Sequence, residues 1–207
     1  MIPYDADAFF ALFAAYNTAI WPAQPAAYAL GLLVLVAMFR RFVQRDRLAA
    51  AALVVMWAFN AVAYHWTYFA TINFLAPVFA AAFAAQALLL AWSGVGRGRL
   101  HFAWRGDPAG WIGLTLMLFA LVGYPAWTWY AGHRWPDLPM FGIAPGPTTI
   151  FTLGALLAGR ATWPLFVIPL LWCAVGGSAA WLLDVPQDLS LPAAAAVTLI
   201  AIAVRRH

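Results

Sequence analysis

Seven apolar runs, separated by short polar stretches, dominate the pattern of hydrophobic and polar positions. A helix that crosses a bilayer needs about 20 mostly apolar residues, with roughly 17–25 tolerated. The runs are Trp21–Phe39, Leu48–Phe69, Phe74–Trp92, Ala109–Tyr130, Thr148–Gly159, Thr162–Leu183 and Leu191–Val204. The fifth and seventh runs are short by this measure. The pattern predicts an all-α membrane protein, with residues 1–207 forming a single domain built as a seven-helix transmembrane bundle.

The segment before the first run, residues 1–20, predicts a helix of another kind. Asp5 or Asp7 can accept hydrogen bonds from the first amides of a helix that starts here. Its bulky apolar side chains are Phe9, Phe10, Leu12 and Phe13. We expect this helix to lie along the membrane interface.

The arginines indicate how the predicted bundle is oriented. Cytoplasmic loops of membrane proteins carry an excess of Lys and Arg. With seven crossings, one side of the bundle carries Arg40, Arg41, Arg45, Arg47, Arg97, Arg99, Arg105, Arg160, Arg205 and Arg206. Arg134 alone lies on the other side, with five of the 7 acidic residues. This distribution predicts an outer N-terminus and an inner C-terminus.

Composition narrows the class of protein further. Hydrophobic residues make up 66% of the 207 residues and charged residues 9%, against about 25% charged in a soluble domain. The net charge of +4 comes from arginines between apolar runs, so we expect the lipid bilayer and no nucleic acid as a partner. A single cysteine, Cys173, excludes an intrachain disulfide and a cysteine-based metal cluster.

Polar side chains in the second run suggest a candidate site. Asn60, Tyr64, Thr67 and Thr71 follow helical spacing, and His65 lies beside them. Because polar groups are costly in hydrocarbon, such a stripe faces protein or water. One interpretation is hydrogen bonding between helices, with His65 bonded to a backbone carbonyl. The other is a polar cavity that opens to the outer side.

The fifth run suggests a helix that starts partway into the bilayer. From Thr148 to Arg160 a helix rises only about 20 Å, against a hydrocarbon core of ~30 Å. The preceding "LPMFGIAPGP" would then descend into the protein, with Thr148 or Thr149 capping the helix. Its free amides would attract an anion or a carbonyl oxygen. The alternative is a tilted, shortened helix whose amides are satisfied by the two threonines.

The histidines offer little for a metal or cofactor. His65, His133 and Asp137 could in principle bind zinc, but no HExxH motif or close histidine spacing supports them. His65 could serve as an axial haem ligand, yet no second histidine lies within a predicted helix. We therefore predict no metal site and no cofactor, with a metal or haem at His65 as the weaker alternative.

Four stretches carry a family resemblance. They are "FFALFAAYNTAIWPAQ", "AYHWTYFATIN", "FGIAPGPTTIFTLGALL" and "IPLLWCAVGGSAAWLLDVPQDLSL". Over nearly its whole length the chain resembles the bacterial membrane proteins grouped as domain-of-unknown-function family 6064. The resemblance implies a multi-pass protein of the bacterial inner membrane and no particular activity. Members of that family often have a cysteine where this chain has Gly146.

Three functions follow from these features as hypotheses. The first is a channel or carrier for a small neutral or weakly anionic solute, in an outward-facing polar pocket. Its ligand-binding residues would be Asn60, Tyr64, His65, Thr67, Thr148 and Thr149. The second is a membrane enzyme or cofactor protein that uses His65. The third is a non-catalytic accessory subunit of a membrane complex. We also expect that the chain can form a homo-oligomer or join a larger membrane complex.

Overall fold

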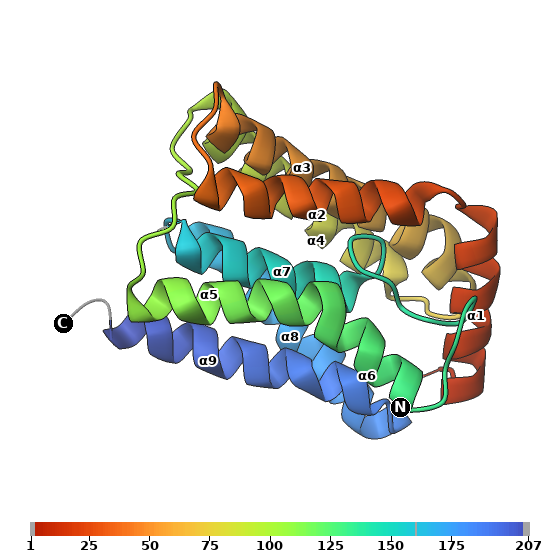
Figure 1. The fold of residues 1–207 in the computed structure, drawn as a ribbon. Coiled ribbons are helices and arrows are strands. Elements are labelled where there is room, and N and C mark those ends of the chain that lie inside the picture. The colour runs from red at the N-terminus through yellow and green to blue at the C-terminus, as the bar shows by residue number, and fades with distance from the viewer. Residues whose placement is uncertain (1–2, 160, 205–207) are drawn as a thin grey trace.

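The computed structural model describes residues 3–159 and 161–204. Helices joined by turns and loops make up this part of the chain, and it contains no strand. Most helices run side by side along one direction, and α1 (Ala6–Ala19) lies across one end of the bundle (Figure 1). The remaining helices are α2 (Ala23–Phe39), α3 (Arg45–Phe59), α4 (Ala76–Leu90), α5 (Pro108–Leu118), α6 (Tyr124–Tyr130), α7 (Pro145–Ala158), α8 (Pro164–Leu183) and α9 (Ser190–Val204).

Shorter helical segments extend several of these helices. Three are π-helical: η1 (Asn60–Tyr68) after α3, η3 (Ala91–Gly96) after α4, and η4 (Phe119–Gly123) between α5 and α6. Two are 3₁₀-helical: η2 (Phe69–Thr71) and η5 (Pro186–Leu189). Pi-helical turns are rare in proteins, and those that occur are often found at functional sites.

Several helices suit a membrane-embedded protein. Five continuous helical stretches in the described part of the chain are long and apolar enough to cross a bilayer: Arg45–Thr71, Ala76–Gly96, Pro108–Tyr130, Pro164–Leu183 and Pro186–Val204. A sixth is counted if α1 and α2, bent by 89° against each other, form one span. Each of the seven predicted runs corresponds to a helix, but α2 has 17 residues and α7 has 14. Both are below the length of about 20 residues.

The apolar side of α1 packs against the protein. Phe9, Phe10, Leu12 and Phe13 are buried, whereas Asp7, Ala11 and Thr18 on the opposite side are exposed. Asp5 begins the helix by accepting a hydrogen bond from the Ala8 amide at 2.9 Å. The phenylalanines of α1 therefore cover the end of the bundle.

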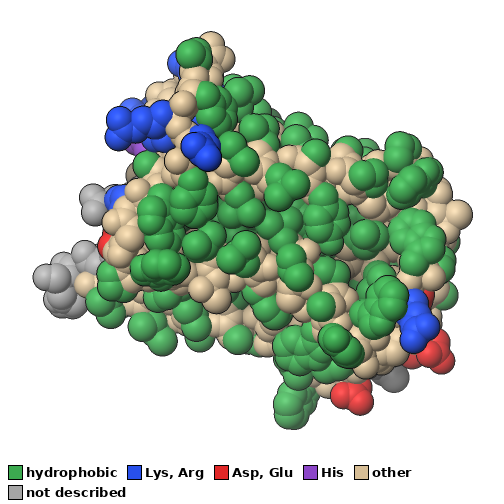
Figure 2. Space-filling view, in the orientation of Figure 1, with side chains coloured by type: hydrophobic (Ala, Val, Ile, Leu, Met, Phe, Trp, Pro, Cys, Tyr) green, Lys and Arg blue, Asp and Glu red, His purple; other side chains and the backbone are tan. Residues whose placement is uncertain are grey.

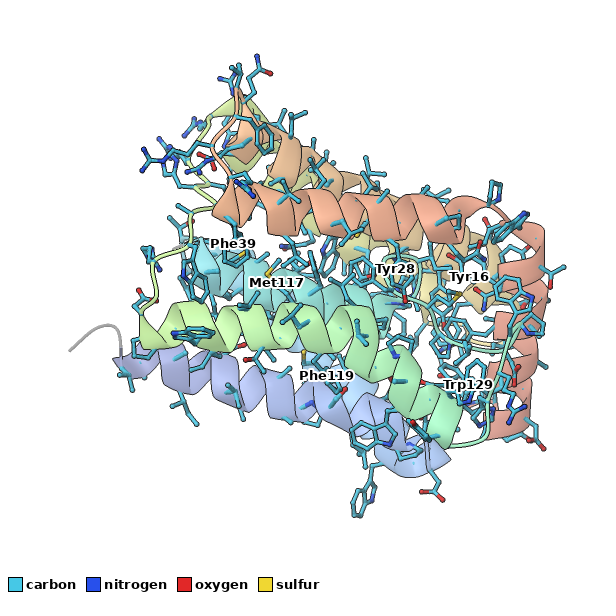
Figure 3. All side chains as sticks on the ribbon, in the orientation of Figure 1. Tyr16, Tyr28, Phe39, Met117, Phe119 and Trp129 are labelled. Atoms are coloured by element: carbon cyan, nitrogen blue, oxygen red, sulfur yellow. The ribbon has the colours of Figure 1, made fainter. Side chains whose placement is uncertain are left out.

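Helix α7 forms the centre of the bundle. All 14 of its residues are buried, so neighbouring helices surround it on every side. Its closest neighbour is α5, where Gly113 and Gly154 allow the two backbones to touch. Figure 3 shows Met117 of α5 in the interior beside these helices. Small residues at such contacts let helices pack tightly where no hydrophobic effect drives them together.

On the face that Figure 2 shows, charged side chains gather at the two ends of the bundle, and the surface between the ends is largely apolar. The arginines of the α2–α3 and α4–α5 connections share one end, where Asp46 accepts a hydrogen bond from the Phe102 amide at 2.9 Å. Acidic side chains gather at the opposite end, which we call the acidic end (Figure 2). Arg134 belongs to it, because its guanidinium lies 5.3 Å from the centre of the Trp129 ring, which Figure 3 labels at this end. Arg160, Arg205 and Arg206, which the sequence analysis also counted, lie outside the described residues.

Candidate functional site

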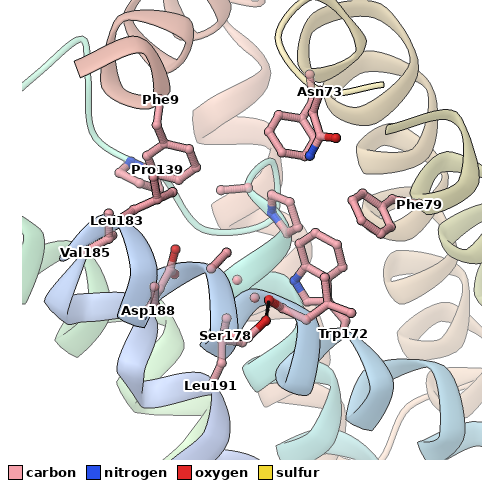
Figure 4. A pocket seen from close by; sticks show the side chains of 18 of the residues that line it. Phe9, Asn73, Phe79, Pro139, Trp172, Ser178, Leu183, Val185, Asp188 and Leu191 are labelled. Atoms are coloured by element: carbon pink, nitrogen blue, oxygen red, sulfur yellow. Dashed lines mark hydrogen bonds between the residues drawn. The ribbon is translucent and has the colours of Figure 1, made fainter. Parts of the chain in front are cut away.

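An aromatic cavity lies near the acidic end, beside the first residues of α7. Its volume is about 200 Å³. Helices α1, α4 and α8, with the η1–η2 and η5 segments, provide its walls. Of the 26 described residues that line it, nine are aromatic: Tyr4, Phe9, Phe13, Tyr64, Phe69, Phe74, Phe79, Tyr124 and Trp172. Figure 4 looks into the cavity, with Asp188 on one side and Phe79 and Trp172 on the other.

Asp188 brings a carboxyl group to this cavity. It is placed there by η5, the short turn that joins α8 to α9. The Tyr124 hydroxyl donates a short hydrogen bond to its Oδ1 atom. Both groups lie against the start of α7, because a Cβ atom built on Gly146 would be 3.0 Å from Asp188 Oδ1 and 3.1 Å from the Tyr124 hydroxyl. Glycine at position 146 therefore leaves room for this pair.

The start of α7 differs from the prediction. The helix begins at Pro145 rather than Thr148, and its N-cap residue, Ala144, makes no side-chain capping bond. The prediction that a threonine caps the helix is wrong, because both threonines lie within it. Since Pro145 and Pro147 have no N–H group, only Gly146 among the first three helical residues has an amide to satisfy. The nearby carboxyl of Asp188 suits the positive end of the helix.

The segment that leads into α7 does descend into the protein, as expected. Gly142 has a positive φ of 78°, and a Cβ there would lie 2.7 Å from Ala27 Cβ. The Tyr16 hydroxyl donates to the Ile143 carbonyl at 2.8 Å. Side chains of neighbouring helices thus satisfy the irregular backbone, which is the condition for such a segment inside a membrane protein.

Asn60 and Thr148 lie together beneath that segment. Asn60 Nδ2 donates to the Met56 carbonyl at 2.8 Å and to the Gly142 carbonyl at 2.9 Å, and lies 3.4 Å from Thr148 Oγ1. The Thr148 hydroxyl donates to the Ala144 carbonyl at 2.6 Å. Neither residue lines the cavity. Their hydrogen bonds join α3 to the start of α7.

The expected polar stripe does not form, because η1 is π-helical. In a π-helix the hydrogen bonds join residues five apart, so the spacing of an α-helix no longer places residues on one face. Asn60 and Tyr64 are buried, whereas Thr67 and Thr71 are exposed. The Thr67 hydroxyl donates to the Val62 carbonyl five residues earlier, at 2.9 Å. Of the six predicted ligand-binding residues, Tyr64 lines the cavity.

His65 lies one aromatic layer behind the cavity. It is fully buried, and its ring centre is 4.5 Å from that of Phe83 and 5.0 Å from that of Trp172. Neither ring nitrogen has a hydrogen-bond partner among the described residues. The expected bond to a backbone carbonyl is therefore absent there. Thr149, the last predicted residue, is likewise buried with an unpartnered hydroxyl.

The other histidine of the acidic end has a different environment. His133 Nδ1 lies 3.3 Å from Asp137 Oδ2, and its ring stacks on Phe10 with centres 3.4 Å apart. Within residues 3–159 and 161–204, no group of three or more His, Cys, Asp or Glu side chains is arranged to hold a metal ion. His65 and His133 thus belong to separate clusters.

Tyr4, near the N-terminus, lines the cavity. Burial raises the pKa of Tyr4 to about 12, an effect partly offset by its hydrogen bond with Asn73. Asn73 also lines the cavity and accepts a hydrogen bond from the Leu75 amide at 2.9 Å. Tyr4 therefore stays neutral and can donate a hydrogen bond at neutral pH.

Tyr124, Trp172 and Asp188 are among the residues of the site that the sequence analysis missed. Trp172 offered a signal, since it lies in the middle of a predicted span, away from the ends where tryptophans usually gather. Asp188 was counted only as an outer charge. The contact between Tyr124 and Asp188 joins residues 64 positions apart, which no spacing rule covers.

Comparison with known proteins assigns the family and no activity. No match to the chain was found among curated proteins or among solved structures. One family model, described as a family of unknown function, matches residues 6–207. Because this match covers nearly the whole chain, the protein belongs to the family DUF6064.

Proposed function

We propose that this protein is a carrier that binds a small amphipathic solute in the aromatic cavity. The observation that supports it is the cavity of about 200 Å³ beside the start of α7, a short helix of 14 residues that are all buried. Transporters often bind their substrates where a discontinuous helix begins inside the bundle. Figure 1 shows that α7 begins well inside the bundle, while α6 and α8 continue toward the acidic end.

The proposal includes the membrane arrangement. In it the bundle crosses the bacterial inner membrane seven times, with the acidic end and the N-terminus outside. Helices α2 and α7 count as crossings, and α1 lies at the outer interface. The arginines of the α2–α3 and α4–α5 connections lie at the end opposite the acidic end, and this separation supports the orientation. The cavity would then open toward the outer half of the bilayer.

The geometry favours a carrier over a channel along the bundle axis. Helix α7 fills that axis with 14 buried residues, and the Trp57 indole donates to Thr152 across the α3–α7 contact at 2.9 Å. A continuous aqueous path would require these contacts to open. A cavity at one end that is exposed alternately to the two sides does not require a permanent path.

The nature of the solute follows from the lining. Apolar and aromatic walls with a few polar groups are typical of small-molecule sites. Among the described residues that line the cavity, none is Arg, Lys or His, and Asp188 is the charged one. A weakly anionic solute, which the sequence analysis allowed, would meet this carboxyl group. The lining favours a neutral or cationic molecule.

Binding is tested first with a neutral aromatic probe, 2-phenylethanol, on purified protein in nanodiscs. Ala179 lines the cavity and Ala174 on the same helix is exposed outside it. We expect saturable binding to the wild type and to Ala174→Trp, and its loss in Ala179→Trp, whose indole fills the cavity. Equal binding by the two variants would remove the cavity as the site.

The carrier step is tested by exchange in proteoliposomes. Benzyltrimethylammonium and benzenesulfonate carry opposite fixed charges and do not cross a bilayer unaided. We expect protein-dependent exchange of at least one of them, abolished by Ala179→Trp and retained by Ala174→Trp. Exchange no faster than in empty liposomes, with correctly inserted protein, would reject a carrier even if 2-phenylethanol binds.

A further inference from the structure

Asp188 is a charged residue without a cationic partner. Among the described residues it takes part in no salt bridge, and its one side-chain hydrogen bond comes from the Tyr124 hydroxyl to Oδ1. Two basic side chains at the same end have other contacts: His133 Nδ1 lies 3.3 Å from Asp137 Oδ2, and the Arg134 guanidinium lies 5.3 Å from the centre of the Trp129 ring. The carboxyl group thus faces the cavity with its second oxygen unused.

The walls opposite Asp188 suit a positive charge. The faces of aromatic rings attract cations, and Trp is the strongest of the three aromatic residues in this respect. Trp172 and Phe79 pack edge-to-face with ring centres 5.4 Å apart, on the side of the cavity opposite Asp188 (Figure 4). Electron-rich rings and a carboxyl group on opposite sides of one cavity are the two features that bind organic ammonium ions.

We propose that the cavity takes an organic ammonium ion, with Asp188 as its counter-ion. This proposal deepens the proposed function and depends on it, because it uses the same cavity. The ammonium group would lie between Asp188 and the Trp172 side of the lining. The apolar body would contact the phenylalanines that α1 and η2 contribute, Phe13 and Phe69.

The size of the cavity limits the ligand. An apolar cavity of about 150 Å³ is large enough for benzene. The volume of about 200 Å³ therefore accommodates one aromatic ring with a short amine-bearing chain, or an alkylamine of similar size. Longer lipids and multi-ring compounds would not fit within it.

The charge of the ligand sets its affinity. An amine gains an ion pair with Asp188 and attraction to the rings, whereas an alcohol of the same shape gains only hydrogen bonds. A carboxylate would be repelled. Since a hydrogen bond to a charged group is stronger than one between neutral groups, the amine should bind roughly tenfold or more tightly than the alcohol.

The test uses three probes that differ mainly in charge: 2-phenylethylamine, 2-phenylethanol and phenylacetate. Their affinities are measured at neutral pH on the full-length protein in nanodiscs. The variants are Asp188→Asn and, as matched control, Asp184→Asn. Asp184 is exposed, lies on the same side of the bundle and does not line the cavity.

The expected result is a preference for the amine that Asp188→Asn removes and Asp184→Asn keeps. Binding of 2-phenylethanol to Asp188→Asn should stay within about threefold of wild type, which also reports that the variant is folded. Equal wild-type affinity for amine and alcohol would overturn the proposal while leaving the cavity as a binding site.

The two proposals can fail separately. If the wild type binds none of the three probes, both the cavity and the ammonium proposal are rejected. If Asp188→Asn does not fold, the comparison of amine, alcohol and carboxylate on the wild type still decides whether the cavity prefers an organic ammonium ion. An amine preference shared by wild type and both variants would assign the selectivity to the rings and overturn the role of Asp188.

Discussion

Replacing Gly154 by alanine will push α5 and α7 apart at their closest contact. A Cβ built on Gly113 would lie 2.5 Å from the Gly154 carbonyl oxygen, and a Cβ on Gly154 would meet the Gly113 carbonyl oxygen in the same way. Both obstacles are backbone atoms, so no side chain can rotate to make room. The helices themselves must move.

The size of the shift can be worked out from these distances. Ordinary contacts of a Cβ begin at 3.4 Å, so the 2.5 Å approach at Gly113 requires a separation of about 0.9 Å, the difference between the two. A gap of 0.5–1 Å forfeits roughly a quarter to a half of the dispersion energy of the atoms that line it. Overpacking of this kind costs about 1–3 kcal/mol. We expect that loss in the free energy of unfolding.

The assay is unfolding of the purified protein in mixed micelles with increasing SDS, followed by tryptophan fluorescence. Gly96→Ala is the control, because Gly96 is exposed and a Cβ there would lie 3.6 Å from the Ala91 carbonyl oxygen, an ordinary van der Waals contact. Since both glycines act at one contact, the double variant Gly113→Ala/Gly154→Ala should cost less than the two single losses together. A loss below about 0.5 kcal/mol for Gly154→Ala would refute the reasoning, because surface substitutions have effects of that size.

Two further substitutions test hydrogen bonds that hold α7 and its leading segment. Thr152→Val leaves the Trp57 indole N–H buried without an acceptor and should lower the free energy of unfolding by about 1–3 kcal/mol. The control, Thr67→Val at an exposed position, should change it little. Equal losses in the two variants would contradict this role of Thr152. Tyr16→Phe removes the hydroxyl that donates to the Ile143 carbonyl and should lower the free energy of unfolding by about 0.5–1.5 kcal/mol. Amide hydrogen exchange between residues 139 and 145 should become faster, whereas the control Tyr130→Phe, at an exposed position, should leave both quantities unchanged. Unchanged exchange in Tyr16→Phe would count against this hydrogen bond.

The helices themselves were predictable from the sequence. Apolar runs of about 20 residues are a strong signal, because every backbone polar group in a bilayer must be satisfied within its own segment. Each predicted run corresponds to a helix, with ends that agree to within a few residues for α2 and α8. The clustering of arginines toward one end was also expected, from the alternation of runs and charges alone.

The polar side chains were much less predictable. The stripe through Asn60 and Thr67 assumed α-helical spacing, and the π-helical backbone of η1 turned its members in different directions. Nothing in the local sequence signals a π-helix. Its hydrogen-bond pattern depends on how the segment packs against α4 and α1, which periodicity does not describe.

The position of α1 shows the same limitation. Its amphipathic pattern is compatible with a membrane interface and with a protein surface, because both offer an apolar side. In the tertiary structure the apolar side of α1 packs on the protein, where Phe13 stacks on Tyr64 with ring centres 5.2 Å apart. This packing makes the Phe9–Phe13 side of the helix one wall of the cavity.

Sequence alone therefore determined the class of this protein, its helices and the separation of charge between its ends, because these depend on runs of neighbouring residues and on their solvent. Only the tertiary structure decided where the site lies, because the cavity brings together Tyr64, Tyr124, Trp172 and Asp188 from four separate segments. Their proximity results from how closely the helices pack around α7. That packing depends on contacts between residues far apart in the chain, such as Gly113 and Gly154.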